Sequence, residues 1–235
     1  MPLLAPMSTI AGQLAFTVGS YHLLKHNKGK GVMIGQMDDM DPRVVTVIGA
    51  GVAGTQSILK AIDNKAFVKV VDSSQAKLDD LKSKFGSNNI EYILSTKDSI
   101  QVSINESDLV IGSVYVVGKE APKVITREML SSMNPGTVMV DVSIDQGGCF
   151  ESSKPTTHDS PTFLENDIVH YCVTNMPGAV PLTATEALNK VSLSYVENLA
   201  NNGIKNALNS DEHLRNGLNI LDGRIVHPAV KEALE

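Results

Sequence analysis

The stretch VVTVIGAGVAG, residues 44–54, decides the fold of this chain. The apolar run Val44–Ile48 predicts a buried strand, and residues 52–63 predict a helix that follows at once. Between them, Gly49, Gly51 and Gly54 form a G-x-G-x-x-G motif. The first glycine permits a tight turn, the second lets the backbone approach a pyrophosphate, and the third lets the helix pack closely on the sheet. The helix start offers unpaired N–H groups to the phosphates.

A second stretch, VKVVDSS at residues 68–74, closes the next apolar run with Asp72. A carboxylate at this position accepts hydrogen bonds from the hydroxyls of an adenosine ribose and repels a 2′-phosphate, which favours NAD over NADP. The alternative is a glycine turn with only a structural role. Because strand, helix, second strand and terminal acid occur in the expected order, we prefer a dinucleotide-binding site.

The rest of the chain extends this pattern in both directions. A helix is expected at residues 8–24 with Ser8 as its N-cap, and a short strand at VMIG, residues 32–35. From residue 44 onward strands alternate with helices. Strands are predicted at 44–48, 67–71, 91–94, 109–113, 138–142 and 169–173, and helices at 52–63, 75–85, 100–106 and 127–133. Unbroken apolar strands between helices predict an α/β Rossmann fold, a doubly wound parallel sheet covered on both faces.

After residue 181 the pattern becomes helical. TATE at residues 183–186 fits a capping box, so a long helix is expected from there to about residue 200. A further helix is expected near 204–207, followed by a turn and a short terminal helix.

Composition restricts the partners of the chain. The net charge of −6 argues against a broad attraction to nucleic acid or to an anionic membrane. No apolar run reaches the ~18 residues that a membrane helix needs. Cys149 and Cys172 lack pairing or metal-ligand spacing, which favours a reduced, cytoplasmic setting. The acidic run at residues 38–41 is read as a solvated loop, so no metal site is expected.

Several longer motifs resemble the alanine dehydrogenase family. They include LLAPMSTIAGQ at residues 3–13, SIDQGG at 143–148, NMPGAVP at 175–181 and GLNILDGRIVHPAV at 217–230. The resemblance implies an NAD-dependent oxidoreductase that interconverts L-alanine with pyruvate and ammonia. The nucleotide-binding part of proton-translocating transhydrogenase has similar motifs and is the alternative enzyme. A non-catalytic NAD-binding remnant is the alternative outside the enzymes.

The resemblance also implies where the cofactor lies. The expected NAD contacts include the glycine loop and come from several segments of the chain. They are Ser8; Gly49, Gly51, Val52, Ala53 and Gly54; Asp72, Lys77 and Ser95 on the adenosine side; Val114 and Tyr115; Val142, Ser143, Ile144 and Asp145 along the nicotinamide half; Lys154; and Val173, Thr174, Asn175 and Met176 over the nicotinamide ring.

Asp145 is the candidate catalytic residue. It follows a predicted strand at the carboxyl edge of the sheet, where parallel sheets bind ligands. The resemblance implies acid–base action beside the nicotinamide. The alternative is that Asp145 only caps the following QGG turn. His158 and His170 are read as ordinary polar or packed residues, because neither belongs to a catalytic constellation.

The same resemblance gives an expected domain organisation. Residues 3–181 would form the NAD-binding domain, with the helix at 8–24 linking two domains, and residues 182–235 would return to an incomplete substrate domain. In this family a substrate-binding portion precedes the glycine motif. We therefore expect a truncated form that binds NAD but turns over L-alanine poorly or not at all. A homo-oligomer, a hexamer by resemblance, is also implied.

Overall fold

The computed structural model describes residues 3–116 and 120–234. They fall into two compact units, one of residues 4–184 and one that consists of Leu3 and the described residues from Thr185 onward. None of the helices in these described ranges is both long and apolar enough to cross a membrane.

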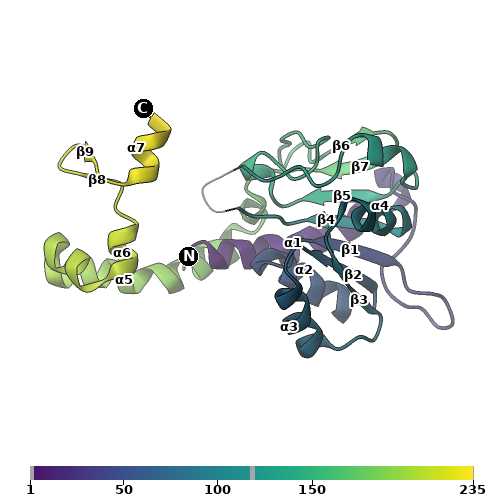
Figure 1. Ribbon diagram of the computed structural model, residues 1–235, viewed down its shortest axis with the longest axis horizontal. Coiled ribbons are helices and arrows are strands. Elements are labelled where there is room, and N and C mark those ends of the chain that lie inside the picture. The colour runs from purple at the N-terminus through teal and green to yellow at the C-terminus, as the bar shows by residue number, and fades with distance from the viewer. Residues whose placement is uncertain (1–2, 117–119, 235) are drawn as a thin grey trace. The chain divides into compact units, whose positions relative to one another are not determined.

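The first unit is built on one mixed sheet of seven described strands (Figure 1). Their order across the sheet is β3-β2-β1-β4-β5-β7-β6, and every neighbouring pair is parallel except β6 with β7. The strands are β1 Val44–Ile48, β2 Phe67–Asp72, β3 Ile90–Leu94, β4 Leu109–Gly112, β5 Val138–Asp141, β6 Thr162–Glu165 and β7 Ile168–Tyr171. Because β1 lies between β2 and β4, the chain reverses its winding direction at the glycine loop, which confirms the predicted Rossmann fold.

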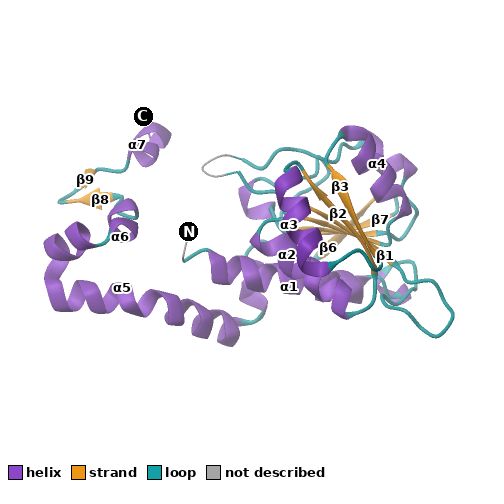
Figure 2. Cartoon of the chain, turned by 60° about the horizontal axis from the view of Figure 1, so that its bottom comes forward, coloured by secondary structure: helices purple, strands orange, loops and turns teal. Residues whose placement is uncertain are grey.

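Helices cover both faces of this sheet (Figure 2). On one face lie α1 Ala5–His22, α2 Val52–Asp63 and α3 Gln75–Phe85, and on the other lie α4 Lys97–Glu106 and the short 3₁₀ helix η2 Glu128–Ser132. Alternate residues of one strand enter different cores: Val47 packs with α1 and α2, whereas Ile48 packs with α4. Both faces of the central strands are therefore buried, as their unbroken apolar sequence predicts.

Several predicted elements differ from the observed ones. Helix α1 begins at Ala5, because Pro6 favours the first turn. Ser8 lies inside that helix and donates its N–H to Leu4 O at 3.0 Å, so the predicted Ser8 cap is wrong. Residues 32–35 form no strand, although Ile34 is buried. The helix expected at 127–133 is the single 3₁₀ turn η2, and the edge strand β6 was not expected.

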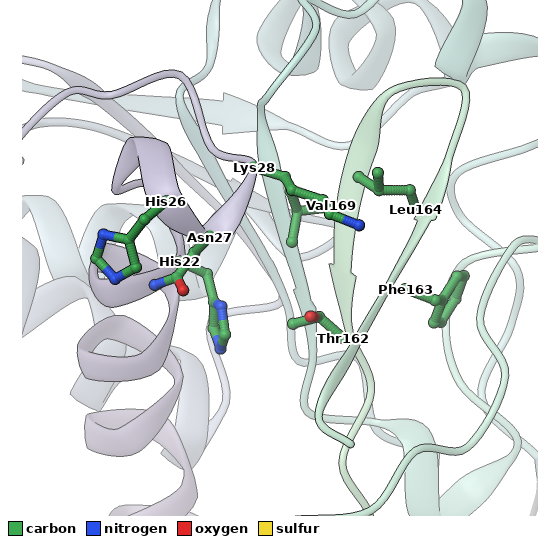
Figure 3. Close-up of a pocket in the computed structure, with 8 residues that line it drawn as sticks. All are labelled: His22, His26, Asn27, Lys28, Thr162, Phe163, Leu164 and Val169. Atoms are coloured by element: carbon green, nitrogen blue, oxygen red, sulfur yellow. The ribbon is translucent and has the colours of Figure 1, made fainter. Parts of the chain in front are cut away.

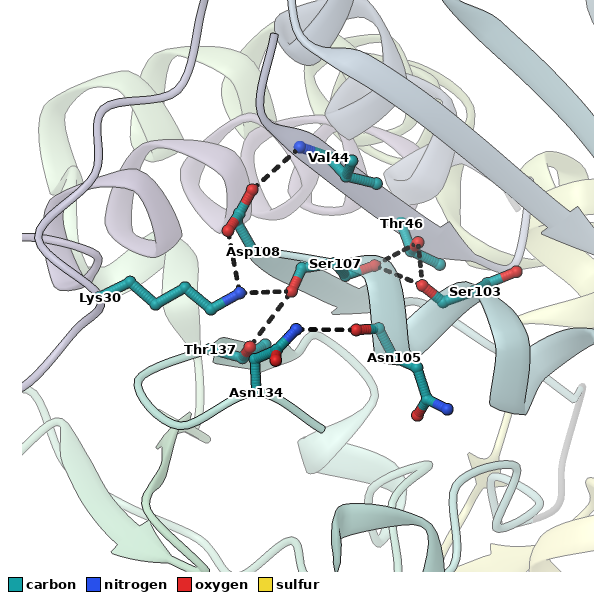
Figure 4. Close-up of polar contacts among 9 residues, drawn as sticks. All are labelled: Lys30, Val44, Thr46, Ser103, Asn105, Ser107, Asp108, Asn134 and Thr137. Atoms are coloured by element: carbon teal, nitrogen blue, oxygen red, sulfur yellow. Dashed lines mark hydrogen bonds and ion pairs between the residues drawn. The ribbon is translucent and has the colours of Figure 1, made fainter. Parts of the chain in front are cut away.

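At the amino edge of the sheet, a polar network fixes the starts of β1 and β4 (Figure 4). Lys30 Nζ lies 2.9 Å from Asp108 Oδ1 and 2.9 Å from Ser107 O. The second oxygen of Asp108 accepts the N–H of Val44 at 3.1 Å. Thr46 shares a 2.6 Å hydrogen bond with Ser107 in the same buried layer. This network satisfies polar groups at the edge opposite the glycine loop, so it has a structural role.

The second unit is mainly helical. Most of it belongs to α5, Pro181–Ser210, whose helical backbone is interrupted at Gly203 with φ 72° and ψ 162°. The non-helical backbone at Gly203 separates two helices, in agreement with the two helices expected at 183–200 and 204–207. Since α5 starts at Pro181, Thr183 lies within its first turn and does not cap it. The unit continues with α6 Glu212–Asn216, a hairpin of β8 Ile220–Leu221 and β9 Arg224–Ile225, and α7 Pro228–Leu234.

Candidate functional site

The glycine loop after β1 uses its three glycines differently. A Cβ added at Gly54 would lie 1.8 Å from Gly49 O, and one added at Gly49 would lie 2.6 Å from Ser113 O. Gly49 also has a φ of 96°, which side chains rarely adopt. In contrast, a Cβ at Gly51 would meet no atom within 4 Å. Gly49 and Gly54 are thus required for packing, whereas Gly51 borders open space.

That open space lies at the start of α2. Gly51 is the N-cap residue, no side chain caps the helix, and its first turn contains no acidic residue. The first N–H groups of a helix have no partner within it and carry partial positive charge. Val52 and Ala53 belong to this first turn. The arrangement suits an anionic group of the size of a phosphate.

Helix α1 packs against α2. Ser57 Oγ donates to Gly12 O at 2.7 Å, and Gln13 Nε2 donates to Gln56 Oε1 at 3.1 Å. A Cβ on Gly12 would lie 2.0 Å from Ala53 O, so the two helices touch backbone to backbone. Ser8 precedes Gly12 by about one helical turn and is half-buried. This places Ser8 on the helix that supports the glycine loop.

Asp72 ends β2 directly beside the glycine loop. Its Oδ2 accepts the N–H of Ala50 at 2.7 Å, and its Oδ1 accepts the N–H of Ser74 at 2.9 Å. Lys77 Nζ lies 3.7 Å from the same carboxylate, and Ser95 donates its N–H to Asp72 O at 2.9 Å. The structure therefore brings together the three residues expected on the adenosine side. A carboxylate has about four acceptor positions, so Asp72 retains capacity for further donors.

The loops after β4 and β5 meet at the same edge. Ser143 Oγ donates to Val114 O at 2.8 Å, which joins two of the predicted segments. Tyr115 follows Val114 and has an exposed side chain, and Val142, directly after β5, is half-buried.

Asp145 connects the β5 loop to the loop after β7. It lies in the 3₁₀ turn η3 Ile144–Gln146, and its side chain is exposed. Its two carboxylate oxygens lie 3.1 and 3.3 Å from the N–H of Asn175. The carboxylate therefore binds the loop after β7 at Asn175, and the QGG turn is not its partner here. On its other side Asn175 O contacts His158 Nε2 at 3.2 Å, which sequence reasoning did not anticipate.

The remaining predicted contacts differ in what they can offer a ligand. The side chains of Val173 and Met176 are buried in the core, so only their backbones are available, and Thr174 donates its N–H to Thr156 O. Lys154 Nζ lies 4.1 Å from the centre of the Phe163 ring, a cation–π contact that orients the ammonium group.

With this geometry described, comparison with known proteins identifies the family. A family model described as alanine dehydrogenase/PNT, C-terminal domain, matches residues 15–228. The chain belongs to this family. Two curated relatives are an alanine dehydrogenase of Halomonas elongata, 47% identical over 99% of the chain, and one of Mycolicibacterium smegmatis, 45% identical over 100%. The chain spans 62% and 63% of their respective lengths.

Solved structures agree with this assignment. An L-alanine dehydrogenase structure superposes with a TM-score of 0.95 at 43% identity, covering 99% of this chain and 64% of that one. A transhydrogenase from Sinorhizobium meliloti superposes with a TM-score of 0.80 at 22% identity, covering 95% and 63%. The second likeness shows a shared fold alone.

One buried acid of this family member escaped sequence reasoning. Asp141 ends β5 as Asp72 ends β2, and each accepts the N–H two residues further on, from Ser143 and Ser74 respectively, at 2.9 Å. Burial raises the pKa of Asp141, although hydrogen bonds from Ser153 and Cys149 oppose this shift. The available signal was an acid at the end of a buried strand, the same signal that singled out Asp72.

His170 is a buried residue of β7, as the sequence predicted for a packed position. Its Nδ1 lies 3.0 Å from Ile168 O and its Nε2 lies 2.8 Å from Ser152 Oγ. The Phe163 ring stacks on it at 4.8 Å. Burial lowers the pKa of His170 to about 4, so the imidazole is neutral at neutral pH.

A separate pocket lies away from these loops, where the end of α1 meets β6 and β7 (Figure 3). Its lining includes His22, His26 and Lys28 on one side and Thr162 and Leu164 on the other. None of the predicted site residues lines it. Within the described ranges, no group of three or more His, Cys, Asp or Glu residues could hold a metal ion.

Proposed function

We propose that the chain binds NAD across the carboxyl edge of its sheet and forms the nucleotide-binding part of an alanine dehydrogenase. The observation that carries this proposal is the arrangement around Asp72. Its carboxylate contacts the glycine loop at Ala50 N, beside the open space at Gly51 and the uncapped start of α2. Phosphate-binding and ribose-binding groups are thus neighbours, as one dinucleotide requires.

In this proposal the two halves of the cofactor contact different loops. The pyrophosphate would lie over Gly51 at the start of α2, and the adenosine would contact Asp72, Lys77 and Ser95. The nicotinamide half would lie along residues 142–145 and 173–176, with Val114, Tyr115, Lys154 and Ser8 beside it. These segments all follow the carboxyl ends of parallel strands or pack against them, where ligands of such sheets bind.

The negative charge of Asp72 supports NAD as the preferred dinucleotide. A 2′-phosphate on the adenosine ribose would approach a buried carboxylate that already accepts two backbone N–H groups. Lys77 offsets part of that charge, but its side chain is half exposed and 3.7 Å away.

For the reaction, we propose the oxidation of L-alanine to pyruvate and ammonia. NAD supplies the hydride acceptor when bound. Asp145 is exposed at the same edge, and the Asn175 N–H orients its carboxylate. It would accept or donate a proton during the steps that involve water and ammonia.

No residue of the chain is assigned here to the carboxylate or the amine of alanine, although hydride transfer needs both groups held. We therefore predict that the chain alone binds NAD but forms little NADH from alanine. Further proposals, by resemblance, are a homo-oligomer, specifically a hexamer, in the cytoplasm, with neither membrane nor nucleic acid as a partner.

Calorimetric titration of the purified chain with NADH, NAD and NADP tests the cofactor. Saturable heat with NADH and NAD, and weaker binding of NADP, is expected; a folded sample that gives no heat with either NAD form would refute the proposal. Alanine-dependent NADH formation, followed by absorbance, tests the reaction. Any turnover by the unchanged chain should fall about 100-fold or more in Asp145→Asn, because a positioned acid–base group contributes at least that factor.

A further inference from the structure

The loop of residues 142–153 leaves β5 and returns to the place where it started. Asp141, the last residue of β5, is fully buried. Its Oδ1 accepts the N–H of Ser143 at 2.9 Å, while its Oδ2 accepts the N–H of Cys149 at 2.8 Å and the hydroxyl of Ser153 at 2.5 Å. One carboxylate therefore holds both ends of the loop.

Both carboxylate oxygens of Asp141 must accept hydrogen bonds, because donors point at each of them. Two backbone N–H groups and one hydroxyl point at the carboxylate, and the Cys149 thiol lies 3.4 Å from Oδ1. An ionised carboxylate only accepts hydrogen bonds, whereas a carboxamide would turn an NH₂ group toward one of these donors. Replacing Asp141 with Asn would therefore keep the size of the side chain but lose at least one of these hydrogen bonds to the loop.

Gly148 allows the loop to close on this carboxylate. It has a φ of 76°, and a Cβ added there would lie 2.8 Å from Asp141 Oδ2. Gly147, with a φ of 87°, completes the turn. The two glycines of the SIDQGG motif thus bring Cys149 N–H back to the end of β5.

The loop carries the residues proposed to face the nicotinamide. Asp141 holds the loop at the N–H groups of Ser143 and Cys149. Within this span, Ser143 Oγ donates to Val114 O at 2.8 Å and Asp145 accepts the N–H of Asn175 at 3.1 Å. We propose that Asp141 is a positioning residue, which fixes this loop and thereby the placement of Asp145 and its neighbours at the nicotinamide half of the site. This inference rests on the proposed binding of NAD.

The test compares two ligands that share the adenosine and pyrophosphate but differ in the nicotinamide. Calorimetry measures the dissociation constants of NADH and ADP-ribose for the wild-type chain, Asp141→Asn and Gly148→Ala. In both variants the NADH constant should rise about 10-fold, the effect of losing one hydrogen bond to a charged group. The ADP-ribose constant should stay within about twofold, because Gly51 and Asp72 are unchanged. The fluorescence of bound NADH should also shift toward that of free NADH.

Asp108→Asn is the matched control. Asp108 is also a buried acid that accepts a backbone N–H, but it lies at the amino edge with Lys30. This control should lower the melting temperature while leaving the ratio of the two dissociation constants as in the wild type. Should Asp141→Asn fail to fold, Ser153→Ala removes a single donor and carries the same comparison.

The outcomes separate this inference from the proposed function. If the wild-type chain binds neither NADH nor ADP-ribose, the proposed function fails. If the wild type binds both, and the variants weaken both ligands equally or neither, then Asp141 has only a structural role and the inference is overturned. Selective loss of NADH affinity in both loop variants, absent in Asp108→Asn, supports it.

Discussion

Gly51 and Gly54 are three positions apart, yet replacing each with Ala should change a different property: ligand affinity for Gly51 and stability for Gly54. A Cβ on Gly51 enters open space, and the residue has φ −76° and ψ −163°, which Ala adopts without strain. Ala is a poorer N-cap than Gly but also restricts the unfolded chain, so these terms of about 0.5–1 kcal/mol nearly cancel. We expect the melting temperature of Gly51→Ala to stay within about 2 °C of the wild type.

Binding should respond to Gly51→Ala instead. The pyrophosphate would have to approach N–H groups at the start of α2 through the volume that the new methyl group fills. Losing one charge-assisted hydrogen bond costs about 1.5–3 kcal/mol, which is a 10- to 100-fold weaker NADH affinity. Calorimetric titration measures this change directly, and differential scanning fluorimetry measures the melting temperature of the same sample.

Gly54→Ala is the companion variant. Its Cβ would lie 1.8 Å from Gly49 O and 2.6 Å from Ser113 Oγ, so α2 must shift away from the sheet. Overpacking of this kind costs about 1–3 kcal/mol of folding stability. The melting temperature should fall by about 2–4 °C for each kcal/mol lost. Wild-type NADH affinity in Gly51→Ala would refute the placement of the pyrophosphate over this glycine.

Three further predictions concern charge. Asp72→Asn should weaken NAD binding by about 10-fold, because the ribose loses a charged hydrogen-bond acceptor. It should also bring the dissociation constants of NAD and NADP closer together, because the repulsion of a 2′-phosphate is removed. Calorimetric titration with both dinucleotides measures the two constants. The folded chain keeps His170 neutral, so unfolding takes up a proton between pH 6.5 and 4, and stability should fall by about 3 kcal/mol as the pH falls through that window. Urea unfolding at several pH values checks this, and His170→Gln should flatten the dependence. Lys30→Met leaves buried Asp108 without its cation and should cost about 3 kcal/mol in urea unfolding with NADH affinity unchanged.

The sequence predicted the central sheet well because local signals and burial agree there. The bounds of β1, α2 and α3 match the predicted ranges, since each has a clear apolar period and a glycine, Ser74 or Gly86 at its ends. The prediction was wrong at residues 32–35, because an apolar tetrapeptide becomes a strand only when another strand pairs with it. Strand β6 was missed for the opposite reason: a half-exposed edge strand is held by its pairing with β7.

The candidate site was predictable as a set of loops but not as a set of contacts. Parallel topology brings the segments after β1, β2, β4, β5 and β7 to one edge, and the sequence predicts that topology. The hydrogen-bond donors to each carboxylate were not predictable, because they come from distant parts of the chain. Asn175, which donates to Asp145, is 30 residues away from it. The four-donor environment of Asp141 likewise depends on a loop closure that no local pattern encodes.

The contact between Gly12 and Ala53 has a mechanical consequence. Because no side chain separates the two backbones at this contact, a shift of α1 would displace the start of α2 as well. Gly19 of α1 packs against Leu109 and Val140, so α1 joins the start of α2 to the central strands. In the proposed site, nucleotide affinity would therefore depend on the position of α1, a helix outside the proposed phosphate contacts.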